Sequence, residues 1–127
     1  MAESRVVLPA EPVCLVGEGV TLREWRDGIV VDEPVGEILL NPVGPSIGYC
    51  VRADHRGRGL ARKAAAMMTR FVHERLGSER VLMEIEDDNA PSIAIAHGLG
   101  FRRTDDPPIS VPDKGRPFIL RTWAHQA

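Results

Sequence analysis

One short segment of the sequence has the composition of an anion-binding turn. Residues 56–61 read Arg-Gly-Arg-Gly-Leu-Ala and stand between an apolar run that ends at Val51 and a helix-like pattern that begins at Gly59. Glycines allow the backbone to turn tightly and to approach a ligand closely. The first N–H groups of a helix point outward, and the helix dipole favours negative charge there. The segment therefore predicts a phosphate-binding turn, with positive charge added by Arg56, Arg58, Arg62 and Lys63.

A second group of polar residues follows the next apolar run. Alternation along residues 80–86 places Glu84 and Glu86 on one face of a strand. Asn89 and Pro91 are typical of the first positions of a helix, with Asn89 as the cap. Ser92 then falls in the first turn of that helix, where a serine hydroxyl often satisfies backbone N–H groups.

The remaining patterns predict the elements that must position these groups. Apolar residues at spacings of three and four predict a long helix over residues 59–76, ended by Gly77. The order of strands and helices predicts an α+β fold with a right-handed βαβ unit. The other expected elements are strands over 12–25 (with a bend or bulge at 17–19), 29–31, 36–40, 47–51, 80–86, 101–104 and 118–123, a helix over 92–99, and loops over 26–28, 41–46 and 105–117.

Length and composition limit the classes of protein. A chain of 127 residues suits one domain, residues 1–127, with one core, and a formal charge of −2 does not favour nucleic acid or a membrane surface. No apolar run is long enough to span a bilayer, and the first residues lack a secretory pattern. We expect a cytoplasmic protein in which Cys14 and Cys50 are reduced, buried thiols, with a disulfide as the alternative. The four histidines lack metal-ligand spacing, so no metal is expected.

At this point the motifs resemble a known family. Arg56-x-x-Gly59-x-Ala61 fits the signature of the GNAT acetyltransferase superfamily, which is Arg or Gln, two residues, Gly, one residue, then Gly or Ala. A dinucleotide fingerprint fits less well, because position 62 is arginine and not a third glycine. The resemblance runs from about Glu11 to Trp123. Blocks similar to the Rim-type branch, which acetylates ribosomal-protein N-termini, are Glu11-Pro12-Val13 through Leu22-Arg23-Glu24-Trp25, Asn89-x-x-Ser92 and Leu99-Gly100-Phe101.

The resemblance implies a mixed, mostly antiparallel sheet in which two neighbouring strands splay apart. The pantetheine arm of acetyl-CoA would insert there like an extra strand, along residues 49–51, with the acetyl carbonyl near Val51. Asn89 would hydrogen-bond the arm, Ser92 would protonate the departing thiolate, and Glu84 is a candidate base acting through water. The implied cofactor-binding residues are Cys50, Val51, Arg56, Gly57, Arg58, Gly59, Leu60, Ala61, Asn89 and Ser92.

Each of these side chains also has an ordinary structural reading. Ser92 can act as a helix-start serine, and Glu84 as a solvated or salt-bridged carboxylate. Cys50 fits a packed thiol better than a nucleophile, because direct acetyl transfer needs no covalent intermediate.

The chain departs from the family after Trp25. Family members carry two helices between the first two strands, and the ten residues from Arg26 to Val35 are too few to form them. The position that carries a general-acid tyrosine in some relatives is Ala96 here. The acceptor side is therefore expected to be shortened after residue 25, and a second copy or another protein is expected to cover the exposed sheet.

The resemblance implies an acetyl-CoA-dependent N-acetyltransferase that transfers its acetyl group directly to a primary amine, on a protein N-terminus or a small molecule. The alternative is a degenerate GNAT domain that binds acyl-CoA or a partner protein without catalysis. A nucleic-acid-binding module fits poorly, because net charge is slightly negative and aromatic residues are few.

Overall fold

The computed structural model describes residues 5–17, 19–24, 35–57, 59–112, 115 and 117–127. These residues form a two-stranded sheet and a six-stranded sheet, together with two α-helices. The elements, in chain order, are β1 (Cys14–Gly17), β2 (Val20–Arg23), β3 (Gly36–Asn41), β4 (Ser46–Val51), the 3₁₀ turn η1 (Ala53–His55), α1 (Leu60–Glu74), β5 (Arg80–Glu86), α2 (Ala90–Gly98), β6 (Arg102–Arg103), β7 (Ile109–Val111) and β8 (Phe118–Gln126).

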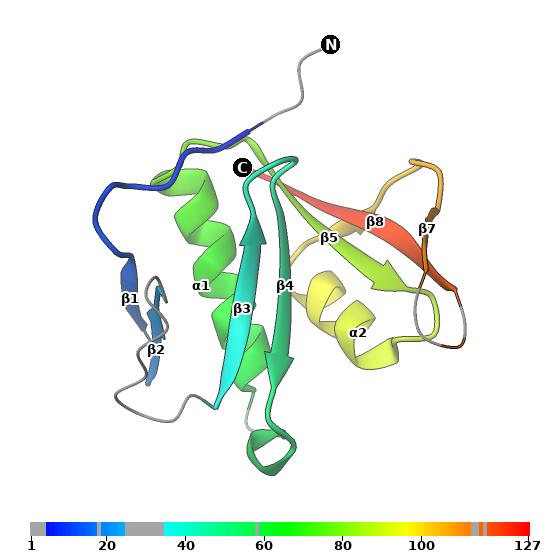
Figure 1. Cartoon of the computed structure of the whole chain (residues 1–127), viewed down its shortest axis with the longest axis horizontal. Coiled ribbons are helices and arrows are strands. Elements are labelled where there is room, and N and C mark those ends of the chain that lie inside the picture. The colour runs from blue at the N-terminus through cyan, green and yellow to red at the C-terminus, as the bar shows by residue number, and fades with distance from the viewer. Residues whose placement is uncertain (1–4, 18, 25–34, 58, 113–114, 116) are drawn as a thin grey trace.

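The larger sheet has the strand order β3-β4-β5-β8-β6, and β7 pairs with β8 (Figure 1). β4 and β5 are parallel and are joined by α1, while the other pairings in this sheet are antiparallel. The expected α+β class, the mostly antiparallel sheet and the central βαβ unit are therefore confirmed.

Both helices pack on one face of this sheet. Along β5, Val81, Met83 and Ile85 are buried while Glu84 is exposed, so alternate residues face opposite sides. We call these two sides the helix face and the second face. The core on the helix face contains Ile47, Ala65, Val72, Val81, Met83, Ile85, Ala96 and Phe101. By register and alternation, the second face carries Leu39, Gly48, Cys50, Leu82, Glu84, Ile109, Val111 and Leu120.

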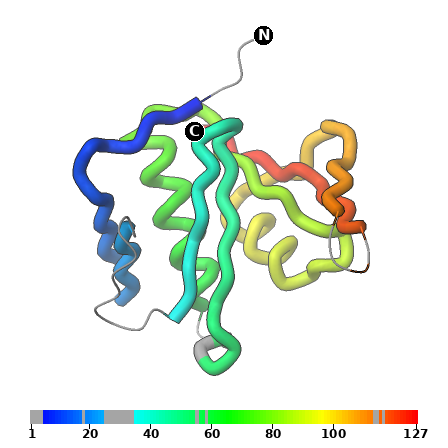
Figure 2. The backbone as a smooth tube through the Cα atoms, in the orientation of Figure 1, coloured from blue at the N-terminus to red at the C-terminus, as the bar shows by residue number. Residues whose placement is uncertain are grey.

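The parallel strands β4 and β5 part after a single paired position. Ser46 is the register partner of Leu82, and the Leu82 N–H donates to the Pro45 carbonyl at 2.8 Å. Beyond that point β4 continues to Val51 and β5 to Glu86 without further pairing between them. Figure 2 shows the two strands diverging from their common end. The expected splayed pair is thus confirmed.

The expected single strand over residues 12–25 is wrong in its topology. The chain folds there into the antiparallel hairpin β1–β2, which contacts α1 and lies outside the larger sheet. Gly17 is the register partner of Val20, so the hairpin turn has two residues between them. Gly19 has a φ of 77°, a left-handed conformation that reverses the chain where a bulge was expected.

Two expectations near the C-terminus also need correction. The loop expected over residues 105–117 contains β7, a short strand at the end of the sheet that lies between prolines. The last strand was expected to end at residue 123 but continues to Gln126, because residues 124–126 pair with the first residues of β5, as far as Arg80. The turn expected at 26–28 and the strand expected at 29–31 lie outside the described residues. The segment from Arg26 to Val35, which was expected to lack the two family helices, lies outside them except for Val35.

Both cysteines are free, as expected, but they are exposed and not buried. Cys14 begins an exposed hairpin strand, and Cys50 points to the second face, where neither helix packs. Neither α1 nor α2 is long and apolar enough to cross a membrane, and no other helix in the described part of the chain is.

Candidate functional site

A cleft lies where β4 and β5 separate. Its volume is about 270 Å³, and its walls come from both strands, the start of α2 and the end of the sheet at β7 and β8. The lining residues are Ile47, Gly48, Tyr49, Met83, Glu84, Ile85, Glu86, Asn89, Ser92, Val111, Phe118 and Leu120.

Backbone groups line both strand walls of this cleft. The Arg52 N–H donates to the Val35 carbonyl at 2.8 Å, so even-numbered residues of β4 direct their backbone groups toward β3. The odd-numbered residues Tyr49 and Val51 therefore direct theirs into the splay. On β5, the Leu82 N–H donates to the Pro45 carbonyl on the side of β4. The even-numbered residues of β5, Glu84 among them, therefore direct their backbone groups into the splay. An extended ligand between the strands would meet donors and acceptors on both sides.

The backbone of Cys50 faces β3, and Cys50 is not among the residues that line the cavity. Val51 has its N–H in the splay, while its carbonyl accepts a hydrogen bond from the Arg56 Nε at 3.1 Å. Neither of these two expected cofactor residues lines the cavity, and of the two only Val51 has its backbone N–H on the side of β4 that faces the splay.

The glycine-rich turn leads directly into α1. Gly57 and Gly59 have φ values of 84° and 72°, which are strained for residues with a side chain. The first helical bond runs from Lys63 N–H to the Gly59 carbonyl at 3.1 Å, so the N–H groups of Leu60 and Ala61 precede the helical ladder. No acidic residue occupies the first turn of α1.

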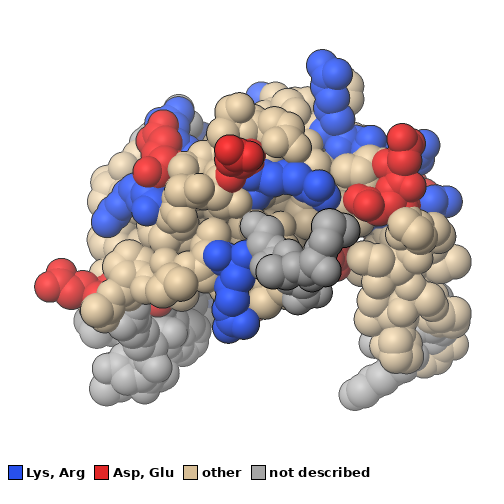
Figure 3. All heavy atoms as spheres, turned by 90° about the horizontal axis from the view of Figure 1, so that it is seen from above, with Lys and Arg blue, Asp and Glu red and all other residues tan. Residues whose placement is uncertain are grey.

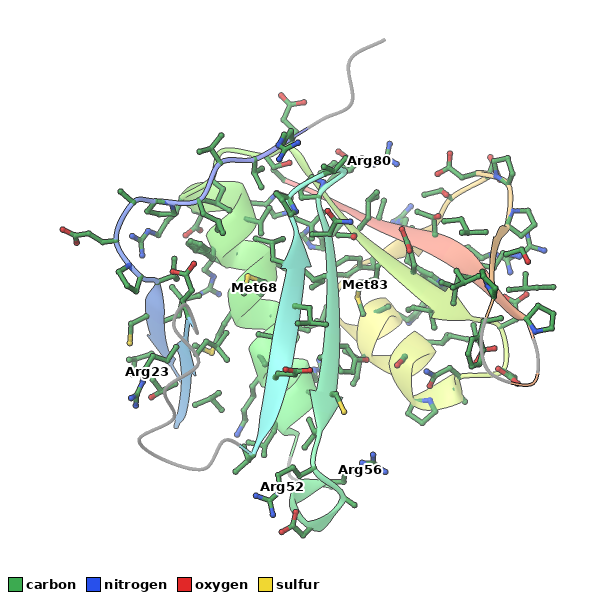
Figure 4. All side chains as sticks on the ribbon, in the orientation of Figure 1. Arg23, Arg52, Arg56, Met68, Arg80 and Met83 are labelled. Atoms are coloured by element: carbon green, nitrogen blue, oxygen red, sulfur yellow. The ribbon has the colours of Figure 1, made fainter. Side chains whose placement is uncertain are left out.

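Arginines surround this turn. Figure 4 shows Arg52 and Arg56 beyond the end of β4, beside η1. Arg56 is exposed, and Arg52 pairs with Asp54 at 3.3 Å. Arg62 is also exposed, and one of its Nη atoms donates to the Gly98 carbonyl at 3.4 Å. Arg58 lies outside the described residues.

A hydrogen-bonded cluster joins β4 to the start of α2. Asn89 is the N-cap of α2, and its Oδ1 accepts the Ser92 N–H at 3.3 Å. The cap is therefore Asn89 and not Ser92. The Ser92 Oγ instead accepts a hydrogen bond from the Tyr49 hydroxyl at 3.1 Å. This contact connects residues that are 43 positions apart in the sequence.

Tyr49 was expected to contribute only backbone groups. It is the single tyrosine of the sequence, and the alternation of Ile47, Tyr49 and Val51 places it on the helix face. The alternation along β4 therefore predicts from the sequence which face of the sheet carries the Tyr49 side chain. Its partner could not be identified from the sequence, because the contact depends on how α2 packs beside the splay.

Glu84 and Ser92 reach the cleft from different sides. Glu84 is exposed on the second face, opposite Thr122 of β8, and it lines the cavity together with Glu86. Ser92 belongs to α2 on the helix face. The splay thus gives two faces access to one cavity. Ala96, where some relatives carry a tyrosine, is fully buried in the core.

The described residues around the cleft do not form a metal site. Among the described residues, no group of three or more histidine, cysteine or acidic side chains is placed to hold a metal ion. Figure 3 views the molecule from the end where β4 and β5 meet, away from the glycine-rich turn, and acidic and basic side chains are interspersed on that face.

The fold and this cleft define a class of protein. The family model for the acetyltransferase (GNAT) domain matches residues 19–102, which is more than half of the chain. The chain belongs to the GNAT acetyltransferase family.

Relatives and solved structures agree with that assignment. The mycothiol acetyltransferase of Saccharomonospora viridis is 35% identical over 72 residues, a stretch that covers 57% of this chain and 21% of that protein. RimJ of Mycobacterium smegmatis, solved in complex with CoA-disulfide, has a TM-score of 0.69 at 23% identity, over 84% of this chain and 52% of RimJ. The protein yncA of Salmonella typhimurium, solved with its cofactor acetyl-CoA, has a TM-score of 0.53 at 32% identity, over 65% of this chain and 47% of yncA.

The match to the mycothiol acetyltransferase thus spans about a fifth of that curated relative, and the matches to the two solved structures span about half of each. The RimJ likeness agrees in fold with the expected Rim-type branch. Of these three names, only that of the mycothiol acetyltransferase states an acceptor.

Proposed function

We propose that the chain is an acetyl-CoA-dependent N-acetyltransferase. The observation that carries this proposal is the single pairing position between β4 and β5, which leaves backbone groups of both strands directed into a cleft. The pantetheine arm has two amides and is extended, so it can pair with these groups as an added strand does. The yncA structure, which contains acetyl-CoA, supports the same ligand.

The pyrophosphate would lie on the turn before α1. The backbone N–H groups of Gly57, Gly59, Leu60 and Ala61 are proposed to bind it, and two left-handed glycines at the start of a helix support this. The turn has no acidic side chain in its helical part, and Arg56 adds charge at its edge. Arg58 is proposed to contact the pyrophosphate only because it lies within the family signature. Asn89 lines the cleft, and its amide N–H groups, which the helix cap does not use, are proposed to bind the arm.

The acceptor is proposed to be an amine that enters as an ammonium group. Two carboxylates, Glu84 and Glu86, line the cleft and favour a cation there. Glu84 is exposed on the second face, so a water molecule can connect it to the entering group. A protein N-terminus and a small amine both meet this description. The acetyltransferase names of the curated relatives support acyl transfer as the reaction class.

In the proposed reaction, acetyl-CoA supplies a thioester carbonyl. Glu84 takes a proton from the ammonium through water, and the free amine is held to attack the carbonyl directly. The Val51 N–H faces the splay and would polarise the carbonyl oxygen. Ser92 lies across the cleft and would assist the departing sulfur.

The proposal is tested with the full chain in two steps. Calorimetric titration with acetyl-CoA measures binding, and incubation with a panel of primary amines measures the release of free thiol. Binding together with thiol release on at least one amine is the expected result. Absence of acetyl-CoA binding would overturn the proposal.

A second candidate is a GNAT domain that binds acyl-CoA without catalysis. Only ten residues, Arg26 to Val35, stand where the family has two acceptor-side helices, and this favours the second candidate. Binding without turnover on any amine of the panel would support it.

We also propose that a second copy of the chain covers the second face, since Leu39, Ile109 and Val111 are exposed there. A cytoplasmic location remains a proposal as well. It is supported by two free, exposed cysteines, which suit a reducing compartment.

A further inference from the structure

The Tyr49 side chain spans the cleft between β4 and α2. Its ring packs against the core on the helix face, and its hydroxyl lies 3.1 Å from the Ser92 Oγ. Both residues are half-buried, and both line the cavity. β4 and α2 form two walls of the cleft and are far apart in the sequence, so this hydrogen bond ties those walls together.

The direction of the hydrogen bond determines what Ser92 can do. A serine hydroxyl has one donor and two acceptor sites. The phenolic O–H of Tyr49 is the more acidic of the two hydroxyls and is the better donor, so Ser92 accepts and its own O–H bond remains available for another partner. Accepting a hydrogen bond also makes a hydroxyl a stronger donor, because the bonds of a chain polarise one another.

The position of this hydroxyl is fixed from two sides. Asn89 holds the Ser92 N–H at 3.3 Å through the helix cap, and Tyr49 holds the Ser92 Oγ. The hydroxyl is therefore not needed for capping. Ala96, on the same helix, is fully buried and has no polar group to offer.

We propose that Tyr49 is a positioning residue that makes Ser92 the hydrogen-bond donor to the CoA sulfur. This inference rests on the proposed function and names the group that stabilises its leaving thiolate. When the amine attacks, a C–N bond forms, the C–S bond breaks and the electron pair of that bond moves to sulfur, while the new amide nitrogen loses its extra proton to water. The thiolate accepts a hydrogen bond from the Ser92 O–H. The thiolate is finally protonated from water and not by Ser92 or Tyr49, because a thiol, with a reference pKa of about 8.5, is a stronger acid than a phenol, with about 10, and than an aliphatic hydroxyl.

The thiol of bound CoA reports this interaction without any acceptor amine. A donor that stabilises the thiolate lowers the thiol pKa, and one hydrogen bond to a charged group corresponds to a pKa change of about one to two units. The experiment titrates the ultraviolet absorbance of the thiolate in the complex of the full chain with CoA. The same titration with desulfo-CoA is subtracted, so that Cys14, Cys50 and Tyr49 cancel.

Tyr49→Phe removes only the hydroxyl and keeps the ring in the core. We expect it to raise the thiol pKa of bound CoA by about half to one pH unit, with the calorimetric Kd for CoA changed less than about threefold. Ser92→Ala should raise that pKa at least as much, and the double variant should add little to Ser92→Ala. Ser92→Thr keeps a hydroxyl and should restore most of the effect. Thr21→Val, which removes the hydroxyl of an exposed residue of β2, should leave both the thiol pKa and the Kd for CoA unchanged.

The outcomes separate the inference from the function on which it depends. Failure of the unmodified chain to bind CoA overturns the proposed function and this inference with it. Normal CoA binding with the same thiol pKa in the unmodified chain, Tyr49→Phe and Ser92→Ala overturns only the inference. In that case a lowered melting temperature of Tyr49→Phe would show that the contact is a structural tie between β4 and α2.

Discussion

Asn89 has two roles that a pair of substitutions can separate. Its Oδ1 caps α2, and the amide N–H groups of the same side chain are proposed to bind the pantetheine arm. Asn89→Ala should lower the free energy of unfolding by about 1 kcal/mol and also weaken CoA binding. Asn89→Asp keeps a capping oxygen but loses the amide donor. It should keep the stability of the unmodified chain and weaken CoA binding by about 0.5–1.5 kcal/mol.

Chemical denaturation and calorimetry with CoA measure the two quantities for each variant. Unchanged CoA affinity in Asn89→Asp would show that Asn89 acts only as a cap.

The sequence reveals some site residues and not others for a physical reason. Asn89 is identifiable because capping is local and depends on residues within one turn. Gly57 and Gly59 are identifiable because a glycine-rich turn before a helix is local as well. The hydrogen bond between Tyr49 and Ser92 depends on packing between distant segments, so no local pattern contains it. The exposure of Cys50 likewise depends on which face the helices leave uncovered.

At the scale of elements, the start of α1 allows stability and ligand binding to be changed in opposite directions. A carboxylate in the first turn of a helix stabilises it by about 0.3–1 kcal/mol, and this turn has none. Ala61→Glu should therefore keep or raise the melting temperature. The same charge should repel the pyrophosphate and weaken CoA binding at least about tenfold, or about 1.4 kcal/mol.

Thermal unfolding and calorimetry with CoA measure these effects. Ala61→Gln is the matched control, because it has nearly the same shape without the charge. Equal CoA affinity in Ala61→Glu and Ala61→Gln would place the pyrophosphate elsewhere.

The end of α1 meets β8 through a histidine pair. The His73 Nε2 lies 2.9 Å from the His125 Nδ1, and the His73 Nδ1 donates to the Ser78 carbonyl at 2.8 Å. Burial, and then the charge of His73, lowers the pKa of His125 below 6.5, although a hydrogen bond to the Leu99 backbone acts in the opposite sense. The unfolded chain therefore binds a proton at His125 more readily than the folded chain does.

This difference predicts a pH dependence of stability. Between the lowered pKa of folded His125 and the ordinary value of 6.5, the unfolded chain binds more protons, so the free energy of unfolding falls as pH falls through this range. Urea denaturation at about pH 7.5 and about pH 5.5 should show that His125→Gln loses less stability than the unmodified chain. His97→Gln, at an exposed histidine of α2, is the control. An equal loss in the unmodified chain and His125→Gln would contradict the prediction.

Strong periodicity explains which elements could be predicted. α1 and β5 have long, regular apolar patterns, and the structure places both within two residues of the expected bounds at each end. The hairpin β1–β2 was missed, because two nearby glycines suit a bulge as well as a turn. β7 was missed because its three residues lie among prolines, and only pairing with β8 makes them a strand.

At the scale of the whole molecule, helices cover one face of the larger sheet, and apolar side chains are exposed on the other. α1 and α2 cover the helix face, while Leu39 is 59% exposed on the second face. Ile109 and Val111 are exposed on the same face at its opposite end. Apolar residues gathered on one side of a small domain indicate a contact surface, and a two-fold contact between identical copies is the commonest form.

Sedimentation velocity at micromolar concentration should therefore show a dimer. Leu39→Lys places a charge on the second face and should shift the chain to monomer without loss of fold. Val16→Lys is the matched control, because Val16 is 76% exposed on β1, outside the larger sheet, and its replacement should leave the dimer intact. A strictly monomeric unmodified chain would count against a self-complementary second face. Dissociation by Val16→Lys and not by Leu39→Lys would move the interface to the hairpin β1–β2.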